Sequence, residues 1–215
     1  MSTLKVNTVE SATTPTVLIS DGLSVSGVST LTGGLKVGSA VTISDNGNFG
    51  ITGIMTASSY SGITSTSLPA GTVIQVVSNT YSTSVQNTTT TFADTGLSAT
   101  INISAGSKVL VMCVQTLDVQ RGSGTVANTC AIKLLRGSTD IFAPANSKNV
   151  GLEGGGTDQR ILFLPLHFSF LDTGASTGSN TYKIQGKVAT ASDSARVRFQ
   201  DDSNPSTMTL LEIAG

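Results

Sequence analysis

The segments GLSVSGVSTLT (22–32) and GLKVGSAVTIS (34–44) repeat each other, and a looser third copy, NFGITGIMTAS, follows at 48–58. Each copy is expected to form a short strand with two or three apolar side chains on one face. A self-similar period of this kind is typical of stacked units that share one core. The residues expected to make those contacts in an oligomeric shaft are Leu23, Val25, Leu35, Val37, Val41, Ile43, Phe49 and Ile51.

One copy of the repeat is not expected to fold alone. Ordering the backbone costs roughly 1–2 kcal/mol per residue, and a narrow apolar stripe buries too little surface to offset that cost. Identical stripes on identical chains are the simplest partners, so the repeats predict an elongated homo-oligomer. A disordered linker is the alternative for this Ser-, Thr- and Gly-rich segment, but its alternation of apolar and polar residues favours ordered strands.

The composition argues against several classes of partner. The chain has 215 residues, a net charge of −1 and 12% charged residues, so bulk electrostatics offers nothing to nucleic acid or to an anionic membrane. No run approaches the roughly 20 apolar residues of a membrane span, so no membrane insertion is expected. The opening MSTLKVNTVE lacks a basic region followed by an apolar core, and we therefore expect no secretory signal peptide.

The two cysteines, Cys113 and Cys130, lie in apolar, strand-like runs. They are interpreted as small buried hydrophobes that stay reduced, and a cross-strand disulfide is the alternative. A metal site would need further ligands at suitable spacing, and the single histidine, His167, also lies in an apolar run. We expect neither a metal nor another cofactor.

The sequence predicts three parts. Residues 1–20 are expected to attach the chain to another protein, with a partly ordered terminus as the alternative. Residues 21–70 form the repeat shaft. Residues 71–215 carry about eight to ten short strand patterns separated by Gly, Asn and Asp, which is the spacing of a β-sandwich or jelly roll. The predicted fold is therefore all-β: an elongated β-repeat shaft followed by a C-terminal sandwich.

Two predicted strands, 108–117 and 160–171, are apolar on both faces, whereas 180–189 has one polar face. The outer face of a two-layer antiparallel sandwich is normally polar because water covers it. Something is therefore expected to cover the outer side of the two doubly apolar strands. Contacts between subunits would do so, which supports oligomerisation independently of the repeats.

Several short segments resemble structural proteins of tailed bacteriophages, in particular marine and cyanobacterial ones. The strongest is FADTGLSATINISAGSKVLV (92–111), with an Asp-Thr-Gly-Leu turn and strand, a Ser/Gly loop and a Lys-led apolar strand. The others, in the same order along the chain, are STLKVN at the start, GITGIMTASSYSG (50–62), KLLRGSTDI (133–141), LDTG…TYKIQ (171–185) and STMTLLEIAG (206–215).

This resemblance implies a virion tail fibre or related appendage, usually a homotrimer. Its distal domain would be jelly-roll-like, similar to trimeric C1q and tumour-necrosis-factor heads. Its N-terminus would dock on other phage tail, baseplate or adaptor proteins. The chain would be made in the host cytoplasm and end up in the virion.

An enzyme is not expected. The sequence has no Gly-x-Ser-x-Gly elbow and no phosphate loop before a helix. Asp201-Asp202 belongs to DDSNP, which is ordinary turn chemistry. GLEGGGTDQR (151–160) is interpreted as a surface loop, because it lacks the Lys-Ser/Thr ending of a phosphate site.

Two roles remain: host-surface adhesion through the distal domain, to a glycan or a protein, or a purely architectural role as a neck or head fibre, baseplate or tail-tip component. Sugar sites usually expose stacking aromatics, whereas Phe163, Phe168 and Phe199 are expected to be buried. Tyr60, Tyr81 and Phe142 are the aromatics that could be exposed. Long polar loops are the usual place for binding residues, and the candidate receptor-facing residues are Arg121, Phe142, Asn146, Lys148 and Asp158.

Overall fold

A computed structural model describes residues 35–37, 41–43, 49–51, 68–121, 127–143, 149–152, 158–192 and 194–215. The chain divides into two units, one up to Tyr60 and one from Ser61, and each is described by itself. The predicted attachment segment 1–20, the shaft residues Leu23 and Val25, and the loop residues Asn146 and Lys148 lie outside the described residues.

The first unit contains a three-stranded antiparallel sheet in the order β1-β2-β3, formed by β1 (Leu35–Val37), β2 (Val41–Ile43) and β3 (Phe49–Ile51). The expectation of one strand per copy is wrong for residues 34–44, because this copy supplies both β1 and β2, which pair within the chain. The register aligns Leu35 with Ile43 and Phe49, and Val37 with Val41 and Ile51. The six predicted shaft residues that are described therefore occupy paired positions of the three strands.

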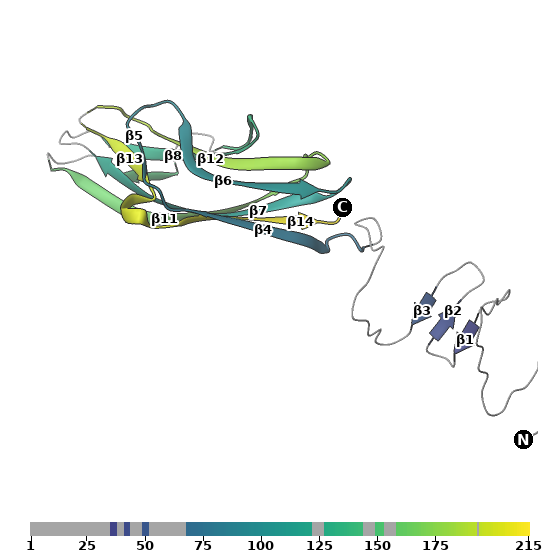
Figure 1. Cartoon of the computed structure of the whole chain (residues 1–215). Coiled ribbons are helices and arrows are strands. Elements are labelled where there is room, and N and C mark those ends of the chain that lie inside the picture. The colour runs from purple at the N-terminus through teal and green to yellow at the C-terminus, as the bar shows by residue number, and fades with distance from the viewer. Residues whose placement is uncertain are drawn as a thin grey trace, which may run out of the picture. The chain divides into compact units, whose positions relative to one another are not determined.

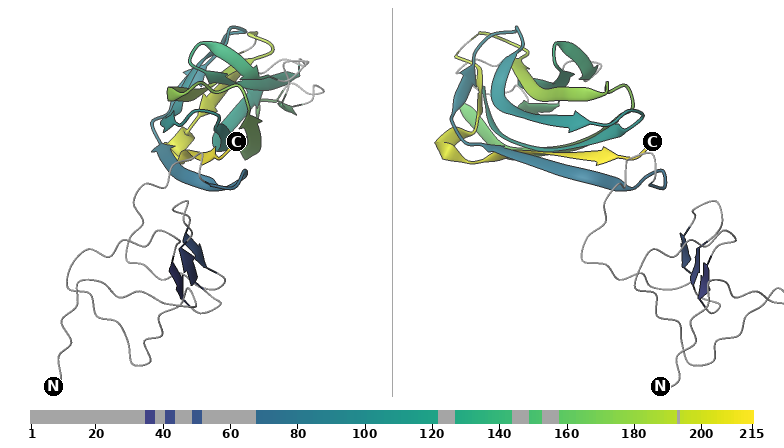
Figure 2. Two further views of the ribbon diagram at one scale, coloured as in Figure 1. Left: turned by 90° about the vertical axis from the view of Figure 1, so that its right-hand side faces the viewer. Right: turned by 45° about the vertical axis from the view of Figure 1, so that its right-hand side comes forward.

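The second unit is a sandwich of two antiparallel sheets, as Figures 1 and 2 show, which confirms the predicted all-β class and sandwich architecture. Its strands are β4 (Val73–Tyr81), β5 (Val85–Asn87), β6 (Ala93–Ile103), β7 (Lys108–Arg121), β8 (Asn128–Arg136), β9 (Thr139–Phe142), β10 (Val150–Leu152), β11 (Arg160–Asp172), β12 (Gly178–Val188), β13 (Arg196–Phe199) and β14 (Ser206–Ile213).

The upper layer in Figure 1 is a five-stranded sheet in the order β10-β8-β12-β6, with β9 beside β8. The other layer is a six-stranded sheet in the order β4-β14-β7-β13-β5, with β11 beside β7. In Figure 1 its strands β4, β14, β7 and β11 lie below, whereas β13 and β5 are seen at the upper left. Strand β7 organises this second sheet. It pairs with β11 along its whole length on one side, and on the other side first with β14 and then with β13.

The core lies between the two sheets, where alternate residues of each strand point inward. Its fully buried members include Leu97, Ile101, Val109, Val111, Leu134, Tyr182, Ile184, Val197, Phe199, Met208 and Leu210. Gly186 of β12 is required by close packing, because a Cβ there would lie 2.2 Å from the Phe199 ring. Cys113 and Cys130 are buried and unbonded to each other, as interpreted from the sequence. Burial raises the pKa of each thiol to about 12.

Candidate functional site

The outer side of the six-stranded sheet carries an uncovered apolar surface. Its three rows run across β4, β14, β7 and β11, and we call them together the apolar face. The rows are Val76, Leu211, Leu110 and Leu171, then Ser78, Thr209, Met112 and Ser169, then Thr80, Thr207, Val114 and His167. Val76, Met112 and Leu171 are 58%, 48% and 47% exposed in the second unit. Large side chains exposed to this extent on a regular sheet mark an interaction surface.

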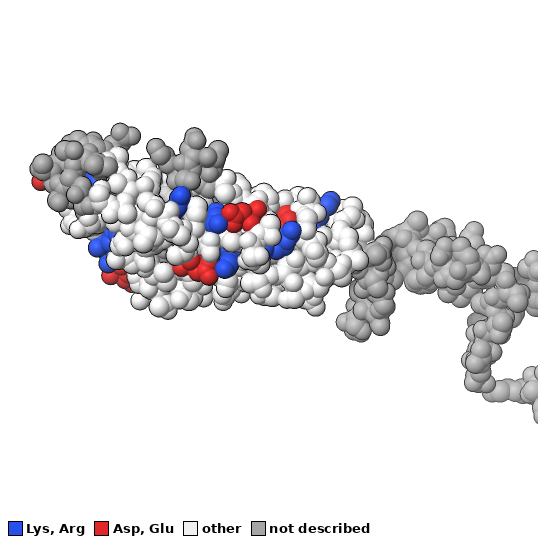
Figure 3. Space-filling view, turned by 90° about the horizontal axis from the view of Figure 1, so that it is seen from above, with Lys and Arg blue, Asp and Glu red and all other residues white. Residues whose placement is uncertain are grey.

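No residue of the apolar face is Asp, Glu, Lys or Arg. The opposite face of the sandwich differs, because acidic and basic side chains mix over the five-stranded sheet (Figure 3). There Lys183 pairs with Asp94 at 3.1 Å and Lys133 with Asp140 at 2.8 Å. The two outer faces thus differ in chemistry. The charged outer face of the five-stranded sheet is well solvated by water, whereas the outer face of the six-stranded sheet packs best against another apolar surface.

A second feature is the connection between β13 and β14. Both strands pair with β7, but residues 200–205 leave the sheet between them and include the 3-10 turn η2 (Asp201–Ser203). We call this segment the excursion. Thr116 of β7 forms hydrogen bonds to the excursion and to the start of β14. The Gln200 N–H donates to the Thr116 carbonyl at 3.1 Å. The Thr116 N–H donates to Ser206 Oγ at 3.0 Å, and the Thr116 hydroxyl donates to the Asn204 carbonyl at 2.9 Å.

The excursion has an unusual backbone. Gln200, Asp202 and Ser203 have φ of 55°, 52° and 62°, in the left-handed region that residues other than glycine seldom adopt. Buried bonds hold the turn in place, since the amide of Gln200 lies 2.8 Å from Ser206 Oγ. Strain of this kind concentrates at functional sites, where the surrounding structure enforces it.

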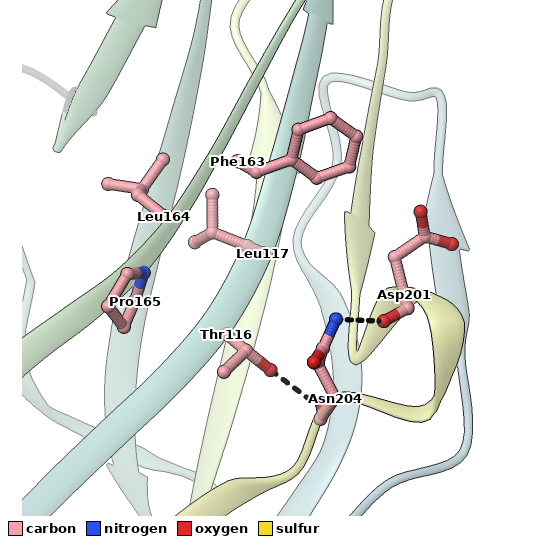
Figure 4. Close-up of a pocket in the computed structure, with 7 residues that line it drawn as sticks. All are labelled: Thr116, Leu117, Phe163, Leu164, Pro165, Asp201 and Asn204. Carbon is pink, nitrogen blue, oxygen red and sulfur yellow. Dashed lines mark hydrogen bonds between the residues drawn. The ribbon is translucent and has the colours of Figure 1, made fainter.

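The excursion borders a hollow of about 260 Å³ on the six-stranded sheet (Figure 4). Phe163, Leu164 and Pro165 line it from β11, Thr116 and Leu117 from β7, and Asp201 and Asn204 from the excursion. Phe163 is 61% exposed, the largest value among the large apolar side chains that the structure describes as exposed. The expected burial of Phe163 is therefore wrong, because this residue lies on the outer side of edge strand β11.

An ion-pair network fixes the acidic side of the hollow. Asp118, fully buried, accepts from Arg198 at 3.3 Å, and Arg196 lies 3.6 Å away. Arg198 Nη2 also forms an ion pair with Asp201 Oδ2, with 2.9 Å between the two atoms. The Asp201 carboxylate is thereby oriented, and the charge of Arg198 is already shared between two carboxylates.

The described residues predicted to face a receptor lie elsewhere. Arg121 is 1% exposed and donates through Nη2 to the Asp158 carbonyl at 2.6 Å, so its expected exposure is wrong for the isolated chain. Phe142 is half-buried and stacks on Phe168 with 5.6 Å between ring centroids. Asp158 is exposed. Sequence reasoning missed Asn204 and treated Asp201 only as part of a turn; the turn is confirmed, and its position beside Phe163 is new.

Within the described ranges, no cluster of three or more His, Cys, Asp and Glu residues is suited to hold a metal ion, and no helix is long and apolar enough to cross a membrane. The described surfaces of the second unit offer apolar packing on the apolar face, and stacking and hydrogen-bond acceptance at the hollow.

No protein-family model matches the chain, and no curated protein does. Among solved structures, the chain is similar to the infectious bursal disease virus Gt strain, at 14% identity over 66% of this chain and 38% of that one, with a TM-score of 0.30. The T=1 particles derived from this virus are 14% identical over 66% of this chain and 37% of that one, with a TM-score of 0.30. The VP2 subviral particle is 14% identical over 66% of this chain and 38% of that one, with a TM-score of 0.27. The chain thus spans under two fifths of these structures, and a likeness of this size identifies neither a family nor a function.

Proposed function

We propose that the chain is a structural subunit of a tailed-bacteriophage virion: a homotrimeric fibre, attached through residues 1–20, whose second unit contacts the host surface. The observation that carries this proposal is the apolar face, which is free of charged residues and uncovered in a single chain. A second copy is the occupant that fits it best, because a surface of Leu, Val, Met, Ser and Thr is complementary to another copy of itself.

The size of the apolar face supports assembly through both units. Four strands about 4.8 Å apart and three rows about 6.8 Å apart give roughly 400 Å², whereas a stable interface buries roughly 800 Å² per partner. The first unit offers the additional surface. Its six predicted contact residues occupy paired positions of a three-stranded sheet, and the proposal places these residues in the contact between the three copies.

An Asp at Met112 tests this proposal. Met112 lies in the middle row of the apolar face and is 48% exposed, so the single chain tolerates the charge, whereas an interface does not. Light scattering should give about three times 21.9 kDa for the unchanged chain and a smaller mass for Met112→Asp. Thr100→Asp, an exposed position on the five-stranded sheet, is the matched control and should remain trimeric. A Met112→Asp trimer, or a monomeric unchanged chain, would contradict the proposal.

A purely architectural virion part is the second candidate. It is favoured by the scarcity of exposed aromatic rings, since Phe163 is the one aromatic among the exposed large hydrophobes of the described residues. Binding of the labelled full-length trimer to whole host cells separates the two roles. An adhesion protein should bind saturably, and an architectural part should leave the cells unlabelled.

A further inference from the structure

We infer that the hollow between β11 and the excursion is a binding subsite for one pyranose ring of a surface glycan. The inference rests on the proposed adhesion role and gives that role a place and a ligand class. Three properties of the hollow carry it: an exposed aromatic ring, two oriented hydrogen-bond acceptors and a rigid frame.

The aromatic ring is that of Phe163. At 61% exposure it costs hydrophobic free energy for as long as water covers it. It projects from a regular strand that pairs with β7 along its full length, so the ring is held by the sheet and does not belong to a loop that could fold away. A pyranose presents several C–H groups on one side, and an electron-rich ring face packs well against them.

The acceptors are Asp201 and Asn204. Asp201 uses Oδ2 for Arg198 at 2.9 Å, and Asn204 uses Nδ2 to donate to the Asp201 carbonyl at 2.9 Å. Within the described residues, Asp201 Oδ1 and Asn204 Oδ1 accept no hydrogen bond. Asn204 is exposed, whereas the Asp201 side chain is 11% exposed, so Asn204 is the more accessible acceptor. Sugar hydroxyls are donors for such acceptors, and a hydroxyl bound to a carboxylate forms one of the stronger neutral-to-charged hydrogen bonds.

The same arrangement disfavours other ligand classes. An anion such as phosphate would meet the Asp201 carboxylate, while Arg198 is already engaged by Asp118 and Asp201. The volume of about 260 Å³ falls just below the roughly 300–1,000 Å³ of pockets for drug-sized ligands, which suits one ring with the remainder of a glycan outside.

The frame is organised before any ligand arrives. Gln200, Ser206 and Gln115 form a buried network beneath the excursion, with Gln115 Nε2 donating to Ser206 Oγ at 2.8 Å. This network holds three residues at positive φ. A site ordered in advance loses less entropy on binding, which matters most for a weakly bound single sugar.

Saturation-transfer NMR on the full-length chain tests the subsite. The probes are the methyl glycosides of glucose, galactose, mannose, rhamnose and N-acetylglucosamine at millimolar concentration. We expect at least one glycoside to receive saturation, with the strongest transfer to the protons of one ring side. Phe163→Ala should weaken its binding at least about fivefold, as expected for a lost stacking contact, and Asn204→Ala should also weaken it.

Ile161→Ala is the matched control, because Ile161 is an exposed apolar residue two positions from Phe163 on the same strand but outside both the hollow and the apolar face. This variant should bind the glycoside as the unchanged chain does. Absence of transfer to every glycoside, or equal binding by Phe163→Ala, would overturn the inference. The oligomeric mass is measured on the same samples, so a trimer that binds no sugar refutes the subsite alone, whereas a monomer refutes the proposed fibre.

Discussion

At the scale of single residues, the hydrogen bonds of buried polar groups hold separate strands and loops of the second unit together. Glu212 of β14 is 1% exposed, and its carboxylate accepts from the Ser104 N–H at 2.7 Å and from Gln75 Nε2 at 2.6 Å. It thereby ties the loop after β6 to both β14 and β4. Burial by itself would raise the pKa of Glu212, but these hydrogen bonds to the charged form outweigh it and hold the pKa below the ordinary value of 4.5.

A depressed carboxyl pKa contributes stability that is present above the unfolded-state pKa and is lost as pH falls through the folded-state pKa. Glu212→Gln should therefore unfold more easily at neutral pH, by about 1–3 kcal/mol from the weakened buried bonds. Below pH 4.5 the difference from the unchanged chain should shrink. Denaturant unfolding at pH 7 and at several acidic pH values measures this. A difference that stays constant across the series would contradict the assigned role.

Other residues show how local chemistry depends on neighbours. Tyr182 is fully buried and donates to Asp172 Oδ2 at 2.8 Å, and Arg136 pairs with the same carboxylate. Burial and the neighbouring carboxylate raise the pKa of Tyr182. The sequence contains Tyr182 and Asp172 ten positions apart without any sign of this contact, which exists because the tertiary structure brings the end of β11 beside Tyr182 of β12.

At the scale of elements, the first unit offers a clean test of which face is buried. Val37 pairs with Val41, and Lys36, the preceding residue of β1, pairs with Thr42. The sequence repeat predicts that Val37 belongs to the buried set and that Lys36 does not. Val37→Asp should weaken assembly, because an unpaired charge buried between subunits costs several kcal/mol. Lys36→Asp changes a charge one position away and should leave assembly intact.

Sedimentation velocity on the full-length variants measures the outcome. Equal masses for Val37→Asp and the unchanged chain would mean that Val37 is solvated. Circular dichroism of both variants should show the strands of the second unit retained, because the division at residue 60 separates the two units.

The central element of the second unit is β7, and it explains why residues 108–117 are apolar on both sides. Its inner residues Val109, Val111 and Cys113 are buried by the opposite sheet, and its outer residue Met112 belongs to the apolar face. The sequence predicted a cover for this outer side. The described residues of the second unit do not supply one, so the prediction that other subunits supply it stands as a prediction.

At the scale of the whole molecule, the two units make separable contributions. The second unit has its own core, and a fragment starting at Ser61 should unfold cooperatively at the same denaturant midpoint as the second unit within the full chain. It should associate more weakly than the full chain, because it lacks the predicted contact residues of the first unit. Fluorescence-independent readouts, such as circular dichroism and light scattering, suit a chain with no tryptophan. A fragment that fails to fold would show that the units depend on each other.

The sequence by itself determined the all-β class, the sandwich, the one polar face of 180–189, and the burial of Cys113 and Cys130. Alternation of side chains fixes these features locally, because successive residues of a strand face opposite sides. Only the tertiary structure decided that residues 34–44 form two strands, that Arg121 is buried, that Phe163 is exposed, and that the excursion places Asp201 and Asn204 beside it. These outcomes depend on which strands become neighbours and which face the second sheet covers, and long-range pairing of this kind leaves no local pattern to read.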